Sequence, residues 1–310
     1  MRFTVEDAVA VSPTRVFNSF SAEAFTLPNQ GATATPEDVL NARDGINLSS
    51  GPDNTGDQNP ERVQIQFDPN LLPDGFDTPA LTVGDQLGDV TGVVGYSFGN
   101  FEVNVTEAFD ITPSGLTQEV TELTGGDSEL TVASYNILNL SAGAGDDAQR
   151  ALLAEQVVTN LNSPDIIGLQ EIQDNNGTEG GADNLETDAT ETLQKLVDAI
   201  AAAGGPSYAF ADIAPDPNAF GGVPGGNIRN AFLYNTERVS LDSLELLDGL
   251  DAFAGSRDPL VGEFTFNGST VTVVNNHFST RYGSTPVFGA VQTIDHAGEA
   301  AREAQSQEKN

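Results

Sequence analysis

The sequence predicts a mixed α/β domain over residues 129–310, preceded by a small β-rich region at residues 1–111. In residues 1–111, short apolar or alternating runs are separated by turn-rich stretches, and no segment of useful length has helical periodicity. After residue 129, strand-like runs alternate with amphipathic segments, which is the pattern of a mixed sheet with helices outside it. The polar, Gly-punctuated stretch at residues 112–128 is interpreted as a linker.

The first region is expected to be a small all-β domain. Its strands are expected at residues 3–11, 62–67, 90–98 and 101–105. Residues 49–60 are rich in Gly, Pro, Asn and Asp, which predicts a long loop. Gly92, Gly95 and Gly99 fall within or beside two of the strands, where glycine is typical of bulges or tight bends.

Two amphipathic helices are expected in the second region. The first can be capped by Asp146 or Asp147 and ends before Pro164, with an apolar stripe of Leu152, Leu153, Val157, Val158 and Leu161. The second covers residues 184–203 and stops at Gly204-Gly205, with a stripe of Leu193, Leu196, Val197 and Ile200. Strands are expected near residues 208–213, 229–235, 261–266 and 270–278, with a tight turn at Asn267-Gly268 and a final helix from Asp295.

The chain is strongly acidic, with a formal net charge of −34 from 46 acidic and 12 basic residues, of which only Lys195 and Lys309 are lysines. The acidic residues are spread along the chain, whereas an acidic interaction tail would concentrate them. At about 1 M salt the Debye length is only ~3 Å, so self-repulsion of this kind is largely screened. The composition therefore favours a protein of a halophilic archaeon; the alternative is an ordinary acidic secreted bacterial protein.

Composition also excludes several classes of protein. There is no cysteine, so neither a disulfide framework nor a thiolate metal site can form. No stretch approaches the roughly 20 apolar residues of a membrane span, and the N-terminus lacks the apolar core of a signal peptide. With so few basic residues, a broad basic groove for nucleic acid is not expected, although a metal ion could neutralise a phosphate locally.

The run from Pro164 to Glu171 is the strongest local signal in the chain. It is a short, largely apolar strand that ends in a carboxylate. A partly buried Glu needs a cation or a strong hydrogen-bond donor, because its desolvation is costly. Glu171 is therefore a candidate metal ligand, and the alternative is a glutamate at a solvated sheet edge with a structural partner.

Four other polar residues lie near predicted strand ends and are candidates for the same site. Asn136 could hold a metal-bound water or position Glu171, or be a simple turn former. His277 could donate a proton or hydrogen bond to a phosphoryl oxygen, or be an exposed strand-end histidine. Arg257 could hold phosphate through its planar fork, or form a surface ion pair. Asn276, with Asn275 beside it, could face phosphate. His296 is expected to be a solvated histidine.

Five sequence blocks carry a resemblance to a known family: Leu130–Leu140, Pro164–Glu171, Arg229–Asn235, Ser256–Leu260 and Val273–Ser279. In this order they resemble the endonuclease/exonuclease/phosphatase superfamily, which includes pancreatic-type deoxyribonuclease, and in particular its large secreted bacterial and archaeal nucleases. The resemblance implies a four-layer αββα sandwich, here a partial one. It also implies Mg²⁺, with Ca²⁺ or Mn²⁺ as alternatives, at Glu171 and Asn136. His277, Arg257 and Asn276 would then act on the phosphate.

The same resemblance gives expectations for the rest of the protein. Residues 83–101 are similar to a β-barrel module of oligonucleotide-binding type, which implies a role in guiding substrate. The expected substrate is DNA or RNA, with no membrane and no obligate protein partner. The parent protein is expected to be secreted or on the cell surface. The glycine-rich run at residues 221–226 lacks the Lys-Ser/Thr pair and the following helix of a phosphate-binding loop, and is expected to be a flexible loop at most.

The sequence departs from the family pattern after His277. Neither the Gly-Asp-x-Asn block, whose Asp activates water, nor the Ser-Asp-His block, whose histidine is the main acid or base, follows that strand. The chain is therefore expected to be a fragment with little or no hydrolytic activity alone. The alternatives to an extracellular endonuclease are a sphingomyelinase-like or inositol-phosphatase-like phosphoesterase, and a non-catalytic nucleic-acid-binding or surface module.

Overall fold

A computed structural model describes residues 1–18, 21–29, 40, 43, 45–46, 61–97, 99–219, 224–285 and 295–308. The loop predicted at residues 49–60 and the first part of the glycine-rich run at 221–226 lie outside these residues. The chain divides into two compact units. Unit 1 comprises Met1–Thr117 and Gly283–His296, and unit 2 comprises Gln118–Tyr282 and Ala297–Asn310.

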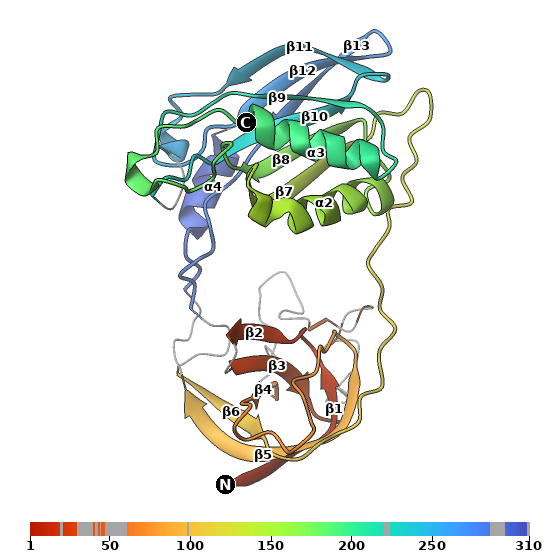
Figure 1. Cartoon of the computed structure of the whole chain (residues 1–310), viewed down its shortest axis with the longest axis vertical. Helices are drawn as coiled ribbons and strands as arrows, with labels where there is room; N and C mark the ends of the chain where they lie inside the picture. Colours follow the sequence, from red (N-terminus) through yellow and green to blue (C-terminus); the bar gives the residue numbers. More distant parts are fainter. Residues whose placement is uncertain are drawn as a thin grey trace. The chain divides into compact units, whose positions relative to one another are not determined.

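Unit 1 is a closed β-barrel, as expected for the β-rich region. Its strands are β1 (Arg2–Ala10), β3 (Ser21–Leu27), β4 (Val63–Phe67), β5 (Gln86–Ser97) and β6 (Asn100–Val105), with a short β2 (Arg15–Asn18) beside β3. The order β1-β5-β6-β4-β3 closes when β3 pairs with β1, and β4 and β6 are parallel (Figure 1). A five-stranded barrel with such crossovers is the oligonucleotide-binding architecture, in agreement with the predicted fold class.

The barrel interior explains two of the three glycines singled out in the sequence. A Cβ at Gly92 would lie 2.1 Å from the Asn104 carbonyl oxygen, and a Cβ at Gly95 would lie 2.5 Å from Asn104 Nδ2. The register between β5 and β6 is continuous there, so these glycines permit close strand approach and do not form bulges. The bend prediction holds for Gly99, whose φ of 86° closes the β5–β6 hairpin. The register of β1 with β5 shifts twice, between Val5 and Ala8 and between Ala8 and Val9.

Unit 2 contains two sheets and three helices. The four-stranded sheet has the order β7 (Val132–Leu140), β8 (Ile166–Ile172), β10 (Arg229–Asn235) and β9 (Tyr208–Asp212). The three-stranded sheet has the order β11 (Val239–Leu246), β12 (Leu260–Phe266) and β13 (Ser269–Asn275). The helices are α2 (Asp147–Thr159), α3 (Thr190–Ala202) and α4 (Glu299–Gln307), and the 3-10 turns are η2 (Ala144–Asp146), η3 (Gly181–Asp183) and η4 (Asp251–Phe253).

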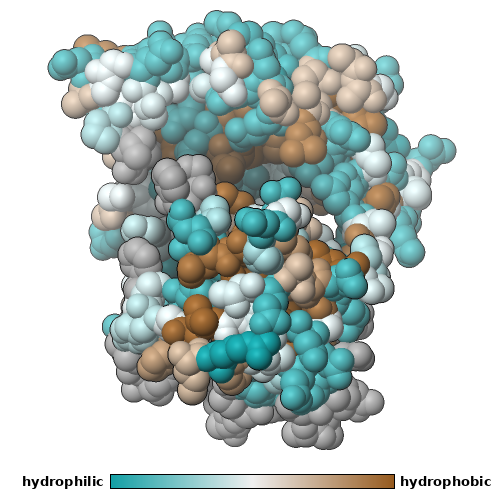
Figure 2. All heavy atoms as spheres, turned by 60° about the horizontal axis from the view of Figure 1, so that its bottom comes forward, coloured by the Kyte–Doolittle hydropathy of each residue, from teal (hydrophilic) through white to brown (hydrophobic). Residues whose placement is uncertain are grey.

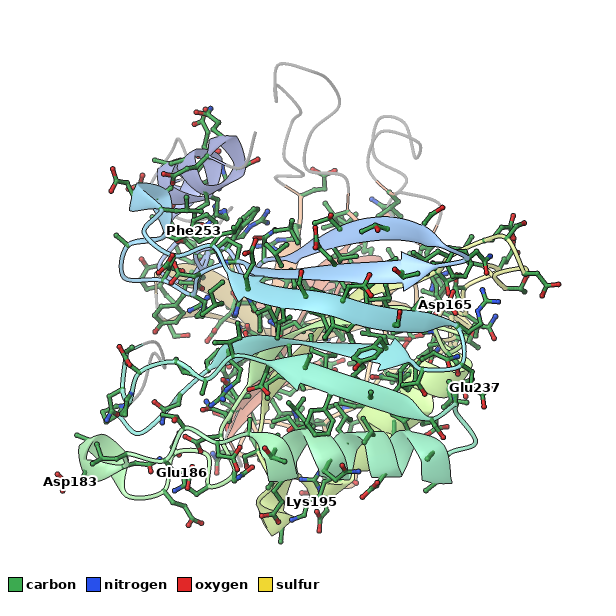
Figure 3. All side chains as sticks on the ribbon, turned by 90° about the horizontal axis from the view of Figure 1, so that it is seen from above. Asp165, Asp183, Glu186, Lys195, Glu237 and Phe253 are labelled. Atoms are coloured by element: carbon green, nitrogen blue, oxygen red, sulfur yellow. The ribbon has the colours of Figure 1, made fainter. Side chains whose placement is uncertain are left out.

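The layers of unit 2 are held by two apolar cores. One core joins α2 and α3 to the four-stranded sheet through residues such as Leu169, Leu193 and Ile200. The other lies between the two sheets, where Phe232 and Phe264 meet edge to face at 5.4 Å between ring centroids. Figure 3 shows this stack with α3 beneath the sheets. The partial αββα sandwich predicted from the sequence is confirmed as a helix–sheet–sheet stack, and Glu263 and Thr272 lie exposed on its outer sheet.

The helices agree with the sequence in type and differ in detail. All four stripe residues of α3 are buried, and the helix ends before Gly204, but it begins at Thr190 and not near residue 184. In α2, Leu153 and Val157 are buried, whereas Leu152 is 50% exposed, so its assignment to the stripe was wrong. Asp146 occupies the N-cap position without capping through its side chain. Its carboxylate instead accepts hydrogen bonds from the backbone and hydroxyl of Ser141.

The β12–β13 hairpin turns at Asn267-Gly268 as predicted. Both residues have positive φ, 50° and 76°, which is the type I′ geometry that the Asn-Gly pair favours. The strands β2, β3 and β11 were not predicted, and α4 begins at Glu299, later than expected. Within the described ranges, no helix combines the length and apolar character needed to cross a membrane.

Candidate active site

Glu171 lies in a β-bulge near the end of β8. Leu169 pairs with Ala231 and Ile172 pairs with Arg229, so three steps along β8 match two along β10. Leu169 and Ile172 both belong to the helix-side core, which a regular strand would not allow because alternate residues face opposite sides. The bulge thus restores the alternation after Glu171 and takes the carboxylate out of that core.

The backbone of Glu171 is strained. Its φ of 64° lies in the left-handed region, which costs a non-glycine residue about 1–3 kcal/mol. A glycine would adopt this conformation without strain. The strained position leaves the Glu171 side chain 18% exposed at the edge of the sheet.

The neighbouring strand β7 is also irregular at this level. Its register with β8 slips between Asn136 and Leu140, and both Leu138 and Asn139 have positive φ. Asn136 lies within β7, before this irregularity, and not at the strand end that the sequence suggested. Its Nδ2 donates a hydrogen bond to Glu171 Oε1 at 2.8 Å, and its Oδ1 accepts from the backbone of Leu138. Of the three interpretations that the sequence offered, positioning Glu171 matches the first bond and the turn former matches the second.

His277 reaches Glu171 from the other sheet. It follows the end of β13 by two residues, and its Nε2 lies 3.4 Å from Glu171 Oε1. Arg257, in the loop before β12, donates through Nη2 to the His277 carbonyl oxygen at 3.4 Å. Three residues from three separate segments, each singled out from the sequence, therefore meet in one place.

Electrostatics at this place keep the histidine neutral. Burial, reinforced by the positive charge of Arg257, lowers the pKa of His277 below its usual value, and the Glu171 carboxylate only partly opposes this. Burial also lowers the pKa of the Arg257 guanidinium, against the opposing effect of Glu171. A neutral imidazole can donate one hydrogen bond and accept another.

Several buried polar atoms here have no partner. In the described part of the chain, seven buried side-chain nitrogen or oxygen atoms lack one, and four of these are His277 Nδ1, Arg257 Nε, Asn276 Oδ1 and Asn230 Oδ1. A buried polar atom without a hydrogen bond costs about 1–3 kcal/mol. Such atoms are rare in folded proteins and are expected where a ligand or ordered water completes the set.

The two asparagines before His277 differ. Asn276 is partly buried, and its Nδ2 makes only a 3.4 Å bond to the Val274 carbonyl oxygen. Asn275 is 4% exposed, and its side chain points into the space between the sheets. The suggestion that Asn275 faces phosphate is therefore wrong. Its partner Gln170 and the nearby Asn230 were not singled out from the sequence, where an amide in a strand carries little signal.

The donor set fits a hard divalent ion through one carboxylate. Glu171 Oε1 accepts a hydrogen bond from Asn136 and lies 3.4 Å from His277 Nε2, whereas Oε2 accepts no hydrogen bond from any described residue. Mg²⁺ commonly uses only one or two protein carboxylates and completes its shell with water and substrate phosphate. Across the residues that the structure describes, however, no group of three or more His, Asp or Glu side chains could hold a metal.

A pocket includes Arg257, one of the three residues that meet here. It is lined by Ile213, Pro215, Ile228, Arg229, Asn230, Leu246, Arg257 and Asp258. Arg229 is held there by an ion pair with Asp212 at 3.0 Å. Arg257 therefore contributes both to this pocket and to the contact with His277, which makes the loop before β12 part of the candidate site. His296 is exposed, as expected, and belongs to unit 1.

Comparison with known proteins assigns each part of the chain to a family model. Residues 133–305 match the model described as Endonuclease/Exonuclease/phosphatase family. Residues 1–115 match a model described as a domain of unknown function (DUF8508). No curated protein matches the chain.

Several solved structures resemble this chain, each with a low TM-score. A family protein from Leptotrichia buccalis has a TM-score of 0.38 at 12% identity, over 58% of this chain and 63% of that chain. A humanized TDP2 of D. rerio has a TM-score of 0.32 at 19% identity, over 49% of each chain. The human Nocturnin catalytic domain has a TM-score of 0.28 at 15% identity, over 47% of this chain and 48% of that chain. The chain spans about half the length of the last two.

Proposed function

The chain belongs to the endonuclease/exonuclease/phosphatase family, and from this premise we propose that it acts as a divalent-metal-dependent nuclease domain that hydrolyses phosphodiester bonds of DNA or RNA. The observation that carries the proposal is the meeting of Glu171, His277 and Arg257 beside buried polar atoms that lack partners. A phosphate group supplies several strong acceptor oxygens and can satisfy the Arg257 Nε–H, whereas the two asparagine oxygens need a donor such as water.

Each residue has a role that follows from its surroundings. Arg257 carries a permanent positive charge and stabilises negative charge on the phosphate. His277 is neutral near pH 7, because its pKa is lowered, and gives a hydrogen bond to a phosphoryl oxygen. Asn136 holds Glu171 through Oε1 and leaves Oε2 for a cation. A bound Mg²⁺, Mn²⁺ or Ca²⁺ would neutralise phosphate charge and polarise the phosphorus–oxygen bonds.

Metal binding is the first test, because it does not depend on turnover. We expect Mn²⁺ to bind the full chain with one principal site by calorimetry, and Glu171→Gln to weaken this binding at least about tenfold. Glu263→Gln is the matched control, since Glu263 lies on the outer face of the three-stranded sheet and its side chain bonds only to Ser243. Equal binding by the wild type and Glu171→Gln would refute the assignment of the metal ligand.

Hydrolysis by this chain alone is expected to be weak. Among the described residues, Glu171 is the only carboxylate within 4.0 Å of a His277 ring nitrogen, and no group of three His, Asp or Glu side chains is present there to hold a metal ion. The test is Mg²⁺-dependent cleavage of plasmid DNA and of RNA, compared with a phosphomonoester, sphingomyelin and an inositol phosphate. Robust plasmid cleavage would contradict the expected weakness. Preference for one of the last three substrates would favour the alternative phosphoesterase classes.

A second candidate function, nucleic-acid binding, concerns the barrel of unit 1. In oligonucleotide-binding folds, the loops after the first and fourth barrel strands contact the ligand. Here Tyr96 and Phe101 flank the β5–β6 turn and are 64% and 75% exposed, with ring centroids 4.9 Å apart. Arg15 lies over the ring of Phe17 in the segment after β1. Figure 2, with unit 1 forward, shows apolar residues among the hydrophilic ones.

These rings suit single-stranded nucleic acid, because any base can stack on an aromatic face. We expect the full chain to bind a fluorescent single-stranded oligonucleotide in high salt, where repulsion from the acidic surface is screened. Tyr96→Ala and Phe101→Ala together should weaken binding by about 1–3 kcal/mol per lost stack without lowering Tm. Unchanged affinity, or a preference for a neutral oligosaccharide, would reject this candidate.

The composition further supports a proposal that the protein acts outside the cell or at its surface in concentrated salt. With a net charge of −34, repulsion destabilises the folded chain at low ionic strength. We expect Tm to rise steadily with added KCl, and more than it rises with an osmolyte such as sucrose. A Tm independent of KCl would count against adaptation to salt.

A further inference from the structure

A buried cluster of three amide side chains lies between the two sheets, beneath the candidate active site. It consists of Gln170 on β8, Asn230 on β10 and Asn275 on β13, which are 5%, 4% and 4% exposed. None of them was assigned a role above. Gln170 and Asn275 lie within two residues of a candidate site residue in the sequence. Asn230 bonds to the loop that contains Arg257.

Asn275 is the centre of the cluster. Its Nδ2 donates to the carbonyl oxygens of Leu169 and Ala231, both at 2.9 Å, and these two residues are a registered pair of β8 and β10. Its Oδ1 accepts a 2.6 Å hydrogen bond from Gln170 Nε2. One side chain of the three-stranded sheet thus clamps the backbones of two strands of the other sheet, immediately before the bulge that presents Glu171.

Gly168 makes room for this clamp. A Cβ at residue 168 would lie 3.1 Å from Asn275 Cγ and 3.3 Å from both amide atoms of Asn275. Such contacts are tighter than ordinary packing, and the bonded amide cannot give way without losing its partners. Gly168 is therefore needed for the close approach of Asn275 and not for an unusual backbone angle.

The cluster spans every segment of the site. Gln170 directly precedes Glu171, and Asn275 precedes His277 by two residues. Asn230 Nδ2 donates to the carbonyl oxygens of Asn275 at 3.3 Å and of Asp258, the residue after Arg257, at 3.4 Å. The relative positions of the Glu171, His277 and Arg257 segments are thus fixed by hydrogen bonds from these three amides.

We propose that Gln170, Asn230 and Asn275 are positioning residues, and that Asn275 sets the separation between Glu171 and His277 by fixing one sheet against the other. This inference rests on the proposed function for its catalytic meaning. Hydrogen bonds within a buried polar network favour one geometry over alternatives, and small displacements of reacting groups lower rates strongly. The cluster acts through the site residues and does not itself bind substrate.

The test compares two buried asparagines of unit 2. Asn275→Leu removes the clamp while keeping the side chain's size, and Asn184→Leu removes a similarly buried amide that bonds to Asn176 and Gly225. Both variants should lower Tm. Only Asn275→Leu should shift the imidazole NMR signals of His277 in the metal-free full chain, with signals assigned by His296→Gln. The residual Mn²⁺-dependent diesterase rate should fall by about 10- to 100-fold, in kcat rather than KM.

The outcomes separate this proposal from the function proposed above. If Glu171→Gln binds Mn²⁺ as tightly as the wild type, the proposed metal site fails, yet a His277 shift confined to Asn275→Leu still supports positioning. If Asn275→Leu leaves His277 unmoved, or changes it no more than Asn184→Leu does, the positioning role is refuted. Should Asn275→Leu fail to fold, Gln170→Met removes the Gln170 bonds to Asn275, Gly168 and Ser134 while leaving the Asn275 bonds to Leu169 and Ala231, and the same readouts decide the question.

Discussion

The two ends of strand β8 carry carboxylates in opposite circumstances. Asp165, just before the strand, accepts hydrogen bonds from the backbone and hydroxyl of Thr131 and is paired with Arg238 at 2.7 Å. Glu171, at the other end, uses one oxygen for Asn136 and His277 and sits on strained backbone. In Figure 3, Asp165 lies at one end of the stacked sheets and Phe253, whose ring packs against Phe278 beside His277, lies at the other.

The difference contrasts a set of satisfied contacts with a set of incomplete ones within one strand. At the Asp165 end each described contact serves the fold, and Arg238 also donates to the carbonyl oxygens of Gly126 and Glu129. At the Glu171 end, polar atoms are buried without partners and a non-glycine residue adopts a positive φ. Strain of this kind persists where the surrounding structure imposes it, and it is common at functional sites.

The largest expected effect is on stability at the Asp165 end. Asp165→Asn removes the charge that Arg238 meets and replaces an acceptor with a donor near Thr131. Removing one partner of a buried pair costs about 3–5 kcal/mol, so the free energy of unfolding should fall by about that amount. Urea unfolding followed by circular dichroism measures it. A loss below about 1 kcal/mol would show that the Asp165 end is not the structural one.

The second prediction concerns activity without loss of stability. Glu171→Gly should lower residual Mn²⁺-dependent diesterase activity on the order of 100-fold, because the carboxylate is removed. It should leave the free energy of unfolding unchanged or raise it by about 1 kcal/mol, because glycine accepts the φ of 64° without strain. Glu171→Gln retains the strain and should lose activity without that gain. A large decrease in the free energy of unfolding in Glu171→Gly would contradict the assignment of backbone strain to Glu171.

The third prediction is a pH dependence. Burial by itself raises the pKa of Asp165, but hydrogen bonds from Arg238 and Thr131 outweigh it and lower the pKa below its usual value. A carboxylate whose pKa is lower when folded stabilises the fold above its unfolded pKa of about 3.9, and this stabilisation is lost as the pH falls through the folded pKa. The stability gap between wild type and Asp165→Asn should therefore narrow below about pH 4. A constant gap in urea titrations from neutral to acid pH would contradict it.

The smallest effect is expected from a single hydroxyl. Thr131→Val removes one of the donors to Asp165 and should cost about 1 kcal/mol. Thr265→Val is the control, because the Thr265 hydroxyl bonds to Asp242 in an exposed setting and its loss should change stability by less than about 0.5 kcal/mol. Equal effects at the two threonines would indicate that the Asp165 cluster adds little beyond ordinary surface bonding.

Sequence patterns predicted the elements that follow simple periods. The stripe from Leu193 to Ile200 and the Asn267-Gly268 turn are local, and both appear in the fold as expected. Strand β11 was missed because its alternation is broken by an irregularity between Leu241 and Ser243, so its apolar residues do not keep a period of two. Leu152 was misassigned because one side of a helical stripe can lie beyond the edge of the buried face.

The sequence indicated which residues form the candidate site but not the distances between them. Glu171, His277, Arg257 and Asn136 were identified from strand-end position and family resemblance. Their separations depend on how one sheet packs on the other, and no local pattern encodes this. The sequence did not predict the bulge at Glu171, because glycine, asparagine and aspartate are the usual residues at positive φ and a glutamate is not. The amides at 170, 230 and 275 look like ordinary strand residues until the two sheets are brought together.

Because of the extra residue at the bulge, the face to which each β8 side chain points depends on the exact number of residues in the strand. Ile166, Gly168 and Gln170 face the second sheet, Ile167 and Leu169 face the helices, and the count resumes at Ile172. Deleting one residue between 166 and 170 would exchange these faces and present an isoleucine or leucine where an amide now bonds. Homologous segments aligned with a gap inside this strand would therefore not share its chemistry, however similar the letters on either side.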